Sequence, residues 1–122
     1  MTFPGQAFQN VDPRHRDNHL HIVLSAPNPD GLVAVANLTT WAPHKDQACI
    51  VHAGEHPFVR HESCVAYERA ALRPAAGIDK LLALGLAAEW PPVTGALLSR
   101  MQRGIHASPN AANELRAALP PT

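Results

Sequence analysis

Residues 52–64, with the sequence HAGEHPFVRHESC, concentrate the side chains of this chain that are best suited to chemistry. The segment holds three of the eight histidines, together with an arginine, a serine and a cysteine. Imidazole accepts and donates protons near neutral pH, and guanidinium binds phosphate oxygens in a bidentate manner. Imidazole and thiolate are also zinc ligands. The segment therefore indicates either a metal site or a pocket for an anion.

The zinc interpretation uses residues whose spacing includes Cys-x2-His and His-x2-Cys, namely Cys49, His52, His56, His61 and Cys64. These residue types suit a tetrahedral zinc site. However, successive side chains of a strand point to opposite faces, so a regular strand would separate Cys49 from His52. A cysteine followed by two apolar residues is typical of core packing. We therefore predict no metal ligand and no cofactor, and keep a zinc-stabilised domain as an alternative.

The second interpretation is an active site built from polar residues at strand ends. Asn37 and Thr39 are two residues apart on one expected strand, so they face the same side of the sheet, and so do His61 and Ser63 on another. His19 stands where a polar loop enters the first of these strands. Short strands bring their ends close together, so we expect these side chains to converge on one cleft.

Such a set of residues suits cleavage of RNA without a metal ion. The ribose 2′-hydroxyl must lose a proton, the leaving 5′-oxygen must gain one, and the extra charge on phosphorus must be stabilised. We predict five catalytic residues, with the two histidines as general acid and base: His19, Thr39, Arg60, His61 and Ser63. The expected product is a 2′,3′-cyclic phosphate.

Four further residues are predicted to bind or orient the substrate. Arg14 and Arg16 lie in the polar, cationic loop of residues 12–18 and could contact phosphates. Asn37 can add a fixed hydrogen bond, and His56 is expected to orient the site from the rigid His-Pro dipeptide.

The elements that must position these residues are strands in the first part of the chain. We expect a short strand through residues 7–8, and a hairpin in which residues 20–25 pair with residues 32–40 through the turn APNPDG at residues 26–31. Two more strands are expected at residues 47–52 and 63–69.

Helical periodicity begins after Pro74. A short helix is expected near residues 78–84, ended by Gly85, and a second at residues 93–105. Ser108 and Pro109 indicate the N-cap and first residue of a last helix that reaches about residue 119. The prediction is a single α+β domain over residues 1–122, mainly β over 1–74 and mainly α over 75–122.

The composition excludes some classes of protein. Ten basic residues balance ten acidic ones, so nucleic-acid binding would have to come from a local patch. With two cysteines and no secretory segment, a cytoplasmic location is expected. No apolar run approaches the roughly 20 residues needed to span a membrane.

The order of these segments resembles the MazF/PemK (Kid) toxin superfamily, as a divergent branch. The similar segments are PGQAFQNV (4–11), HLHIVLS (19–25), VAVANLTT (33–40), ESCVAYERAAL (62–72) and LLALGLA followed by VTGALLSRMQRGI (93–105). The resemblance implies an SH3-like antiparallel β-barrel with C-terminal helices. It also implies an endoribonuclease that cleaves single-stranded RNA, forms a homodimer and has a cognate antitoxin protein.

Residue by residue, the resemblance is partial. Thr39 falls where the family carries its catalytic Ser or Thr, Ser63 falls on a strand serine, and Glu68 falls near an acidic residue of the PemK branch. The family's catalytic arginine is replaced by His19, and a strand arginine of the PemK branch is replaced by Ala66. A non-catalytic module of the same fold that binds a nucleotide or a peptide is therefore a second alternative.

Overall fold

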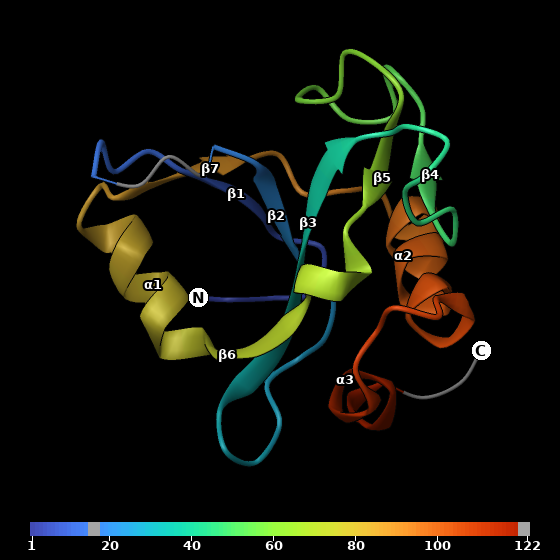
Figure 1. Cartoon of the computed structure of the whole chain (residues 1–122). Coiled ribbons are helices and arrows are strands. Elements are labelled where there is room, and N and C mark those ends of the chain that lie inside the picture. Colours follow the sequence, from blue (N-terminus) through green and yellow to red (C-terminus); the bar gives the residue numbers. More distant parts are fainter. Residues whose placement is uncertain (15–17, 120–122) are drawn as a thin grey trace.

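The computed structural model describes residues 1–14 and 18–119, and within this part of the chain it contains seven strands, three α-helices and one 3-10 helix (Figure 1). Their order is β1 (Ala7–Asn10), β2 (Leu20–Val23), β3 (Leu32–Thr40), β4 (Ile50–Val51), β5 (Ser63–Val65), the 3-10 helix η1 (Tyr67–Arg69), β6 (Ala71–Pro74), α1 (Ala75–Ala83), β7 (Ala87–Trp90), α2 (Gly95–Ala107) and α3 (Asn113–Ala118).

The strands form one sheet in the order β4-β5-β3-β2-β1-β7, with β6 as a further partner of β3, and every pairing is antiparallel. The predicted hairpin is confirmed, because β2 pairs with β3 in a register that places His21 opposite Asn37. Its turn is stabilised by Asn28, whose side-chain oxygen accepts hydrogen bonds from the backbone of Asp30 and Leu32. Gly31 follows with a φ of 76°, a conformation that glycine adopts without steric cost.

Strand β3 is the longest element of the sheet and is shared between two sets of neighbours. Its first half pairs with β6 (Leu32 with Pro74, Val35 with Ala71), and its last three residues pair with β5. β5 and β6 follow one another along this side, with η1 between them. η1 therefore leaves the sheet beside Ala36 and Asn37, just before the β3 residues that pair with β5.

Both faces of the sheet are covered by helices, as Figure 1 shows for α1 on one side and α2 with α3 on the other. Side chains alternate along β3, as expected for a strand. Val33 and Val35 pack with Ile78 of α1, whereas the alternate residues join the larger core with α2 and α3. The residues of this larger core that come from β3, α2 and α3 are Ala34, Ala36, Leu38, Leu97, Met101, Ile105 and Leu115.

The row of β3 that packs against α1 changes from apolar to polar along its length. Val33 and Val35 belong to the core under α1, and the next two positions of the same row are Asn37 and Thr39. On the neighbouring strand His21 continues the row and stacks on Phe8, with ring centroids 5.3 Å apart. A polar row beside an apolar core marks the place where a site can open to solvent.

Helix α2 agrees with the prediction of a helix at residues 93–105. Thr94 is its N-cap, and the Thr94 hydroxyl oxygen accepts a hydrogen bond from the backbone N–H of Leu97 at 3.2 Å. Helix α1 ends before Gly85, whose φ is 72°, as the glycine stop predicted.

The prediction for the last helix was wrong at its start. Ser108 is not an N-cap: it is the C-cap of α2, with its N–H bonded to the carbonyl oxygen of Gly104 at 2.8 Å. Its hydroxyl group donates to the carboxylate of Asp46 and accepts from the backbone N–H of Asn110 at 3.0 Å, in a turn and not at the start of a helix. Helix α3 consequently begins only at Asn113.

The strand limits were also partly wrong. The strand predicted at 47–52 is reduced to Ile50–Val51, and the one predicted at 63–69 ends at Val65. Tyr67 then turns inward, and its hydroxyl donates to the carbonyl oxygen of Met101 at 2.6 Å. Strands β6 and β7 were not predicted, and β7 lies within the part of the chain expected to be mainly helical.

The α+β prediction is confirmed, with an open antiparallel sheet. Among the described strands, none pairs β7 with β4 or β6, so closure into an SH3-like barrel stays a prediction. No helix within the described ranges is long and apolar enough to cross a membrane.

Candidate functional site

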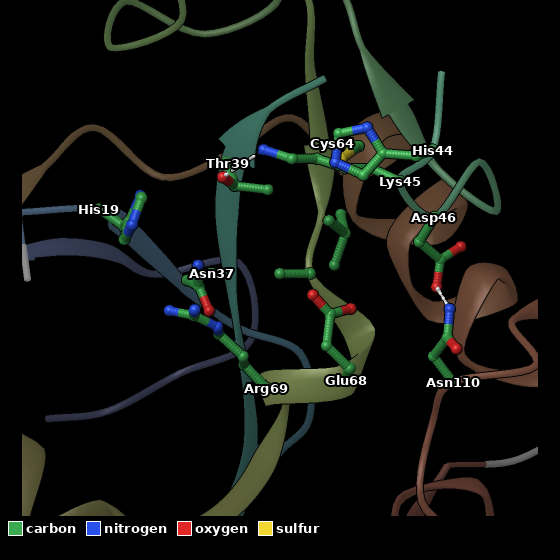
Figure 2. A pocket seen from close by; sticks show the side chains of 12 residues that line it. His19, Asn37, Thr39, His44, Lys45, Asp46, Cys64, Glu68, Arg69 and Asn110 are labelled. Carbon is green, nitrogen blue, oxygen red and sulfur yellow. Dashed lines mark hydrogen bonds between the residues drawn. The ribbon is translucent and has the colours of Figure 1, made fainter. Parts of the chain in front are cut away.

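Two neighbouring pockets open at the polar end of β3. The larger, about 390 Å³, lies between β3, η1 and the loop after β3, and we call it the η1 pocket. Its polar lining comprises His19, Asn37, Thr39, His44, Lys45, Asp46, Glu68, Arg69 and Asn110 (Figure 2).

The smaller pocket, about 240 Å³, lies against the end of the 52–62 segment, and we call it the loop pocket. Its lining comprises Gln9, Asn18, His19, Leu38, Thr39, Thr40, Phe58, Val59, Arg60, His61 and Ser63. The two pockets share His19 and Thr39. They therefore form one polar region with a hydroxyl group and an imidazole at its centre.

The pairing of strands explains why His19 and Thr39 meet. Residue His21 of β2 is opposite Asn37 of β3. Two residues further along this antiparallel register, His19 comes to the level of Thr39. Thr39 is also opposite Cys64 of β5, so β2 and β5 approach the end of β3 from its two sides. Figure 2 shows His19 on one side of β3 and η1 with Glu68 on the other, while the side chain of Arg69 extends across β3 to the side of His19.

A lysine is held over the centre of this region. The ammonium group of Lys45 donates to the backbone carbonyl oxygen of Thr40 at 2.7 Å and to the hydroxyl oxygen of Thr39 at 3.4 Å. These two bonds fold the loop after β3 back over the strand end, as Figure 2 shows. A fixed positive charge beside a hydroxyl group is suited to binding an anionic group such as phosphate.

The opposite wall of the η1 pocket is held by Asp46. Its carboxylate accepts hydrogen bonds from the hydroxyl of Ser108, from the amide of Asn110 at 3.0 Å and from the backbone N–H of Ala48 at 2.9 Å. Partial burial acts to raise the pKa of Asp46, but these hydrogen bonds together outweigh it and lower the pKa. Asp46 is therefore an ionised structural anchor that joins the loop after β3 to the turn between α2 and α3.

Glu68 and Arg69 of η1 complete the η1 pocket with one charge of each sign. With Lys45 and Asp46, the charged side chains of the lining balance. Because the carboxylate of Asp46 is occupied by its three hydrogen bonds, the charged groups that can meet a ligand are those of Lys45, Arg69 and Glu68.

The thiol of Cys64 lines the η1 pocket but is not activated. Burial raises the pKa of Cys64, and the nearby carboxylates of Glu68 and Asp46 act in the same direction, against the attraction of Lys45. Thiolate, not thiol, is the nucleophile. Cys64 is therefore a packed thiol, which agrees with its expected position on a strand.

In the loop pocket, His61 and Ser63 are connected to each other and to β3. The Nε2 atom of His61 lies 2.9 Å from the hydroxyl of Thr40, and the Ser63 hydroxyl donates to the carbonyl oxygen of His61 at 3.0 Å. Both His61 and Arg60 are exposed. These contacts orient an exposed imidazole in the lining of the loop pocket.

All five residues predicted as catalytic line the loop pocket: His19, Thr39, Arg60, His61 and Ser63. Asn37, predicted to bind substrate, lines the η1 pocket. The structure thus brings these six residues together from the residue before β2, from β3, from the 52–62 segment and from β5. Their chemical roles stay predictions.

The assignment of His56 to substrate binding was wrong. His56 is 3% exposed, its Nε2 atom lies 2.6 Å from the carbonyl oxygen of Pro91, and its Nδ1 atom accepts from the backbone N–H of Phe58 at 3.0 Å. Both ring nitrogens are therefore used inside the protein. His56 holds the 52–62 segment against the end of β7.

Of the two loop arginines, Arg14 does not join the site in the structure. Arg14 forms an ion pair with the buried carboxylate of Asp12 at 2.7 Å, and it lines neither the η1 pocket nor the loop pocket. Arg16 lies outside the described residues.

The cysteine and histidine residues of the zinc alternative are not gathered into a site. Cys49 belongs to the core, His56 is engaged as above, and His52 pairs with the carboxylate of Glu62 at 2.8 Å. Over residues 1–14 and 18–119, no group of three or more histidine, cysteine, aspartate or glutamate residues is placed to hold a metal ion.

Sequence reasoning missed the part of the site that comes from the loop after β3 and from η1. Residues 41–46 carry no strand or helix signal in the sequence, and Arg69 falls within the strand expected at residues 63–69. A signal was present, because three titratable residues in succession follow the Thr39-Thr40 strand end. Nothing in the sequence alone shows that Lys45 folds back over Thr39.

Comparison with protein-family models, with curated proteins and with solved structures found no significant match. The likeness to the MazF/PemK superfamily therefore rests on the residues quoted above, and the function has to be argued from the geometry of the two pockets.

Proposed function

We propose that this chain is a metal-independent endoribonuclease that cleaves single-stranded RNA at the junction of the η1 pocket and the loop pocket. The observation that carries the proposal is the shared position of His19 and Thr39. A hydroxyl group and an imidazole are flanked by Lys45 and Arg69 on one side and by Arg60 and His61 on the other. This arrangement suits a phosphodiester that lies across Thr39.

The proposed reaction is an intramolecular transfer. The ribose 2′-oxygen attacks the adjacent phosphorus, and the new P–O2′ bond forms as the P–O5′ bond breaks. One imidazole, His19 or His61, accepts the proton of the 2′-hydroxyl, and the other gives a proton to the leaving 5′-oxygen. The products are a 2′,3′-cyclic phosphate and a free 5′-hydroxyl.

The cationic groups stabilise the charge that develops on the phosphorus oxygens. The ammonium of Lys45 is already fixed by Thr40 and Thr39, so it needs little reorganisation when the charge forms. Arg60 and Arg69 can each offer paired donors to phosphate oxygens. The hydroxyls of Thr39 and Ser63 add neutral hydrogen bonds.

We further propose that the fold is an SH3-like barrel of the MazF/PemK type, in which Thr39 occupies the position of the catalytic hydroxyl. Helix α1 packs against both β6, the partner of β3, and β7, the partner of β1. This packing supports a barrel in which α1 covers the space between these two strands. A homodimer and an antitoxin protein belong to the same proposal. The replacement of the family arginine by His19 means that Lys45 and Arg69 would have to supply the permanent positive charge.

The test is cleavage of a fluorescent single-stranded RNA in the presence of EDTA, with the product identified by mass spectrometry. Cleavage should persist in EDTA, leave a cyclic phosphate and show a bell-shaped pH profile, because imidazoles act as acid and base. His61→Ala should lower the rate about 100-fold, as the loss of a positioned acid or base does. His106→Ala is the matched control, since His106 lies on α2 and lines none of the described pockets.

Two results would contradict the proposal. Activity that disappears in EDTA and returns with zinc would favour a metal site. Absence of cleavage together with tight binding of a nucleotide or peptide would favour a non-catalytic binding module. The η1 pocket, whose lining carries equal numbers of acidic and basic side chains, also suits such a module.

A further inference from the structure

The loop pocket has the chemical character of a site for a flat, amphipathic ring. Its inner surface is apolar and aromatic, from Leu38, Phe58 and Val59. Its rim is polar, from the side chains Gln9, Asn18, Arg60, His61 and Ser63. Proteins that bind single-stranded nucleic acid place bases on aromatic rings in such surroundings and hydrogen-bond their edges.

The aromatic wall of the loop pocket is fixed before any ligand binds. The ring of Phe58 makes an edge-to-face contact with Trp90, with centroids 5.0 Å apart and an interplanar angle of 89°. The backbone N–H of Phe58 donates a hydrogen bond to Nδ1 of His56. The imidazole of His56 is in turn hydrogen-bonded through Nε2 to the carbonyl oxygen of Pro91. A wall fixed in this way loses little conformational entropy when a ligand stacks against it.

The segment that carries Phe58 is braced at its base as well. Glu55 forms an ion pair with Arg100 of α2, and Arg100 also donates to the carbonyl oxygen of Ile50. The carboxylate of Glu55 accepts in addition from the backbone N–H of His52 at 2.7 Å. The 52–62 segment is thus tied to α2 and β7, so the loop pocket is preformed.

Some hydrogen-bonding groups of the rim are bonded within the protein, and others can bond a ligand. The amide of Gln9 is used on both sides, donating to the carbonyl oxygen of Asn18 at 3.0 Å and accepting from the indole N–H of Trp90 at 3.3 Å. The hydroxyl of Ser63 donates to the His61 carbonyl, which leaves its oxygen able to accept. The exposed guanidinium of Arg60 can donate.

We infer that the loop pocket binds the nucleobase next to the phosphate that occupies the η1 pocket. The inference rests on the proposed function, because it takes the phosphate of the same substrate to lie beside Thr39 and Lys45. The two pockets share His19 and Thr39, so a sugar at their junction can place its phosphate in one and its base in the other. The base stacks on Phe58, and the contact accepts purines and pyrimidines.

The test is calorimetric titration with three probes: ribose 5-phosphate, adenosine 5′-monophosphate and uridine 5′-monophosphate. Both nucleotides should bind about tenfold more tightly than the base-free sugar phosphate, in line with the energy of base–aromatic stacking. Phe58→Leu should remove this difference and leave the affinity for ribose 5-phosphate unchanged. Phe3→Leu, at an exposed ring outside both pockets, is the matched control and should change none of the three affinities.

The outcomes separate this inference from the proposed function. If ribose 5-phosphate binds and the nucleotides bind no more tightly, the base site is refuted while the phosphate site stands. If Lys45→Ala does not weaken the binding of any probe, the phosphate site is refuted instead. Because Phe58→Leu disturbs the contact with Trp90, NMR cross-relaxation between adenine protons and the Val59 methyl groups of the unaltered protein gives an independent answer. Absence of that cross-relaxation at saturating nucleotide would overturn the inference.

Discussion

Gly104 in α2 lies directly behind the candidate site, where a single methyl group should have a large effect. A Cβ atom at this position would lie 1.9 Å from the hydroxyl oxygen of Tyr67, 2.6 Å from its Cζ and 3.0 Å from its Cε2. Tyr67 is fully buried, and its hydroxyl donates to the Met101 carbonyl. The variant Gly104→Ala must therefore displace the tyrosine ring or α2.

The cost can be worked out from these contacts. Forcing a methyl group into a packed core costs about 1–3 kcal/mol, and a buried hydroxyl that loses its partner costs about 1–3 kcal/mol more. Alanine regains about 1 kcal/mol of helix propensity relative to glycine. The free energy of unfolding should fall by about 3 kcal/mol, and Tm by roughly 10 °C for a domain of this size.

Gly95 provides the matched control in the same helix. It is the first residue of α2, and a Cβ atom there would meet nothing within 4 Å. Gly95→Ala should therefore stabilise the protein by up to about 1 kcal/mol. Urea denaturation followed by Trp fluorescence measures both variants.

A second substitution shows whether the clash is with the hydroxyl. Tyr67→Phe removes the atom that is closest to the added methyl, although the contacts of the ring carbons remain. The double variant should lose less stability than the sum of the two single variants. If Gly104→Ala were as stable as Gly95→Ala, the packing of η1 against α2 described above would be wrong.

Three further outcomes can be measured in solution. Arg100→Met should lower Tm at pH 7, because the hydrogen bond from Arg100 lowers the pKa of Glu55 and the pair contributes stability only while that carboxyl is ionised. The deficit in Tm should shrink as the pH falls from 4.5 through the folded pKa of Glu55, and a deficit that grew as the pH fell would contradict this. The chain has a single tyrosine, and burial raises the pKa of Tyr67, so alkaline titration at 295 nm should show no phenolate before the protein unfolds. Burial also raises the pKa values of Cys49 and Cys64, so both thiols should react slowly with a thiol reagent at pH 8 and rapidly in denaturant; fast labelling of the native protein would place a thiol at the surface.

The hairpin and α2 could be predicted because their signals are local. The hairpin has a turn sequence whose asparagine and glycine act within a few residues, and α2 has an apolar spacing together with a threonine N-cap. The short strands β6 and β7 have no such signal. Strand β7 begins with two alanines, which have low β-propensity, and β6 ends at a proline. Both strands exist because β1 and β3 offer them backbone partners.

For the candidate site too, only the residues that local sequence signals place could be predicted. Thr39, His61 and Ser63 could be found because strand alternation and strand ends constrain where side chains go. Arg69 could not, because its position depends on Tyr67 reaching Met101 far along the chain. His56 was misassigned for a related reason. Its type suggests chemistry, but a carbonyl of Pro91, distant in sequence, converts it into a packing residue.

The hydrogen bonds of Asp46 have a consequence for the order in which the protein is made. The wall of the η1 pocket that contains Asp46 is anchored by Ser108 and Asn110, which leave the ribosome long after the strands that carry Thr39 and Ser63. A nascent chain can therefore form the sheet before it can complete this wall. Under the proposed function, a growing chain should therefore lack ribonuclease activity until the turn after α2 has emerged.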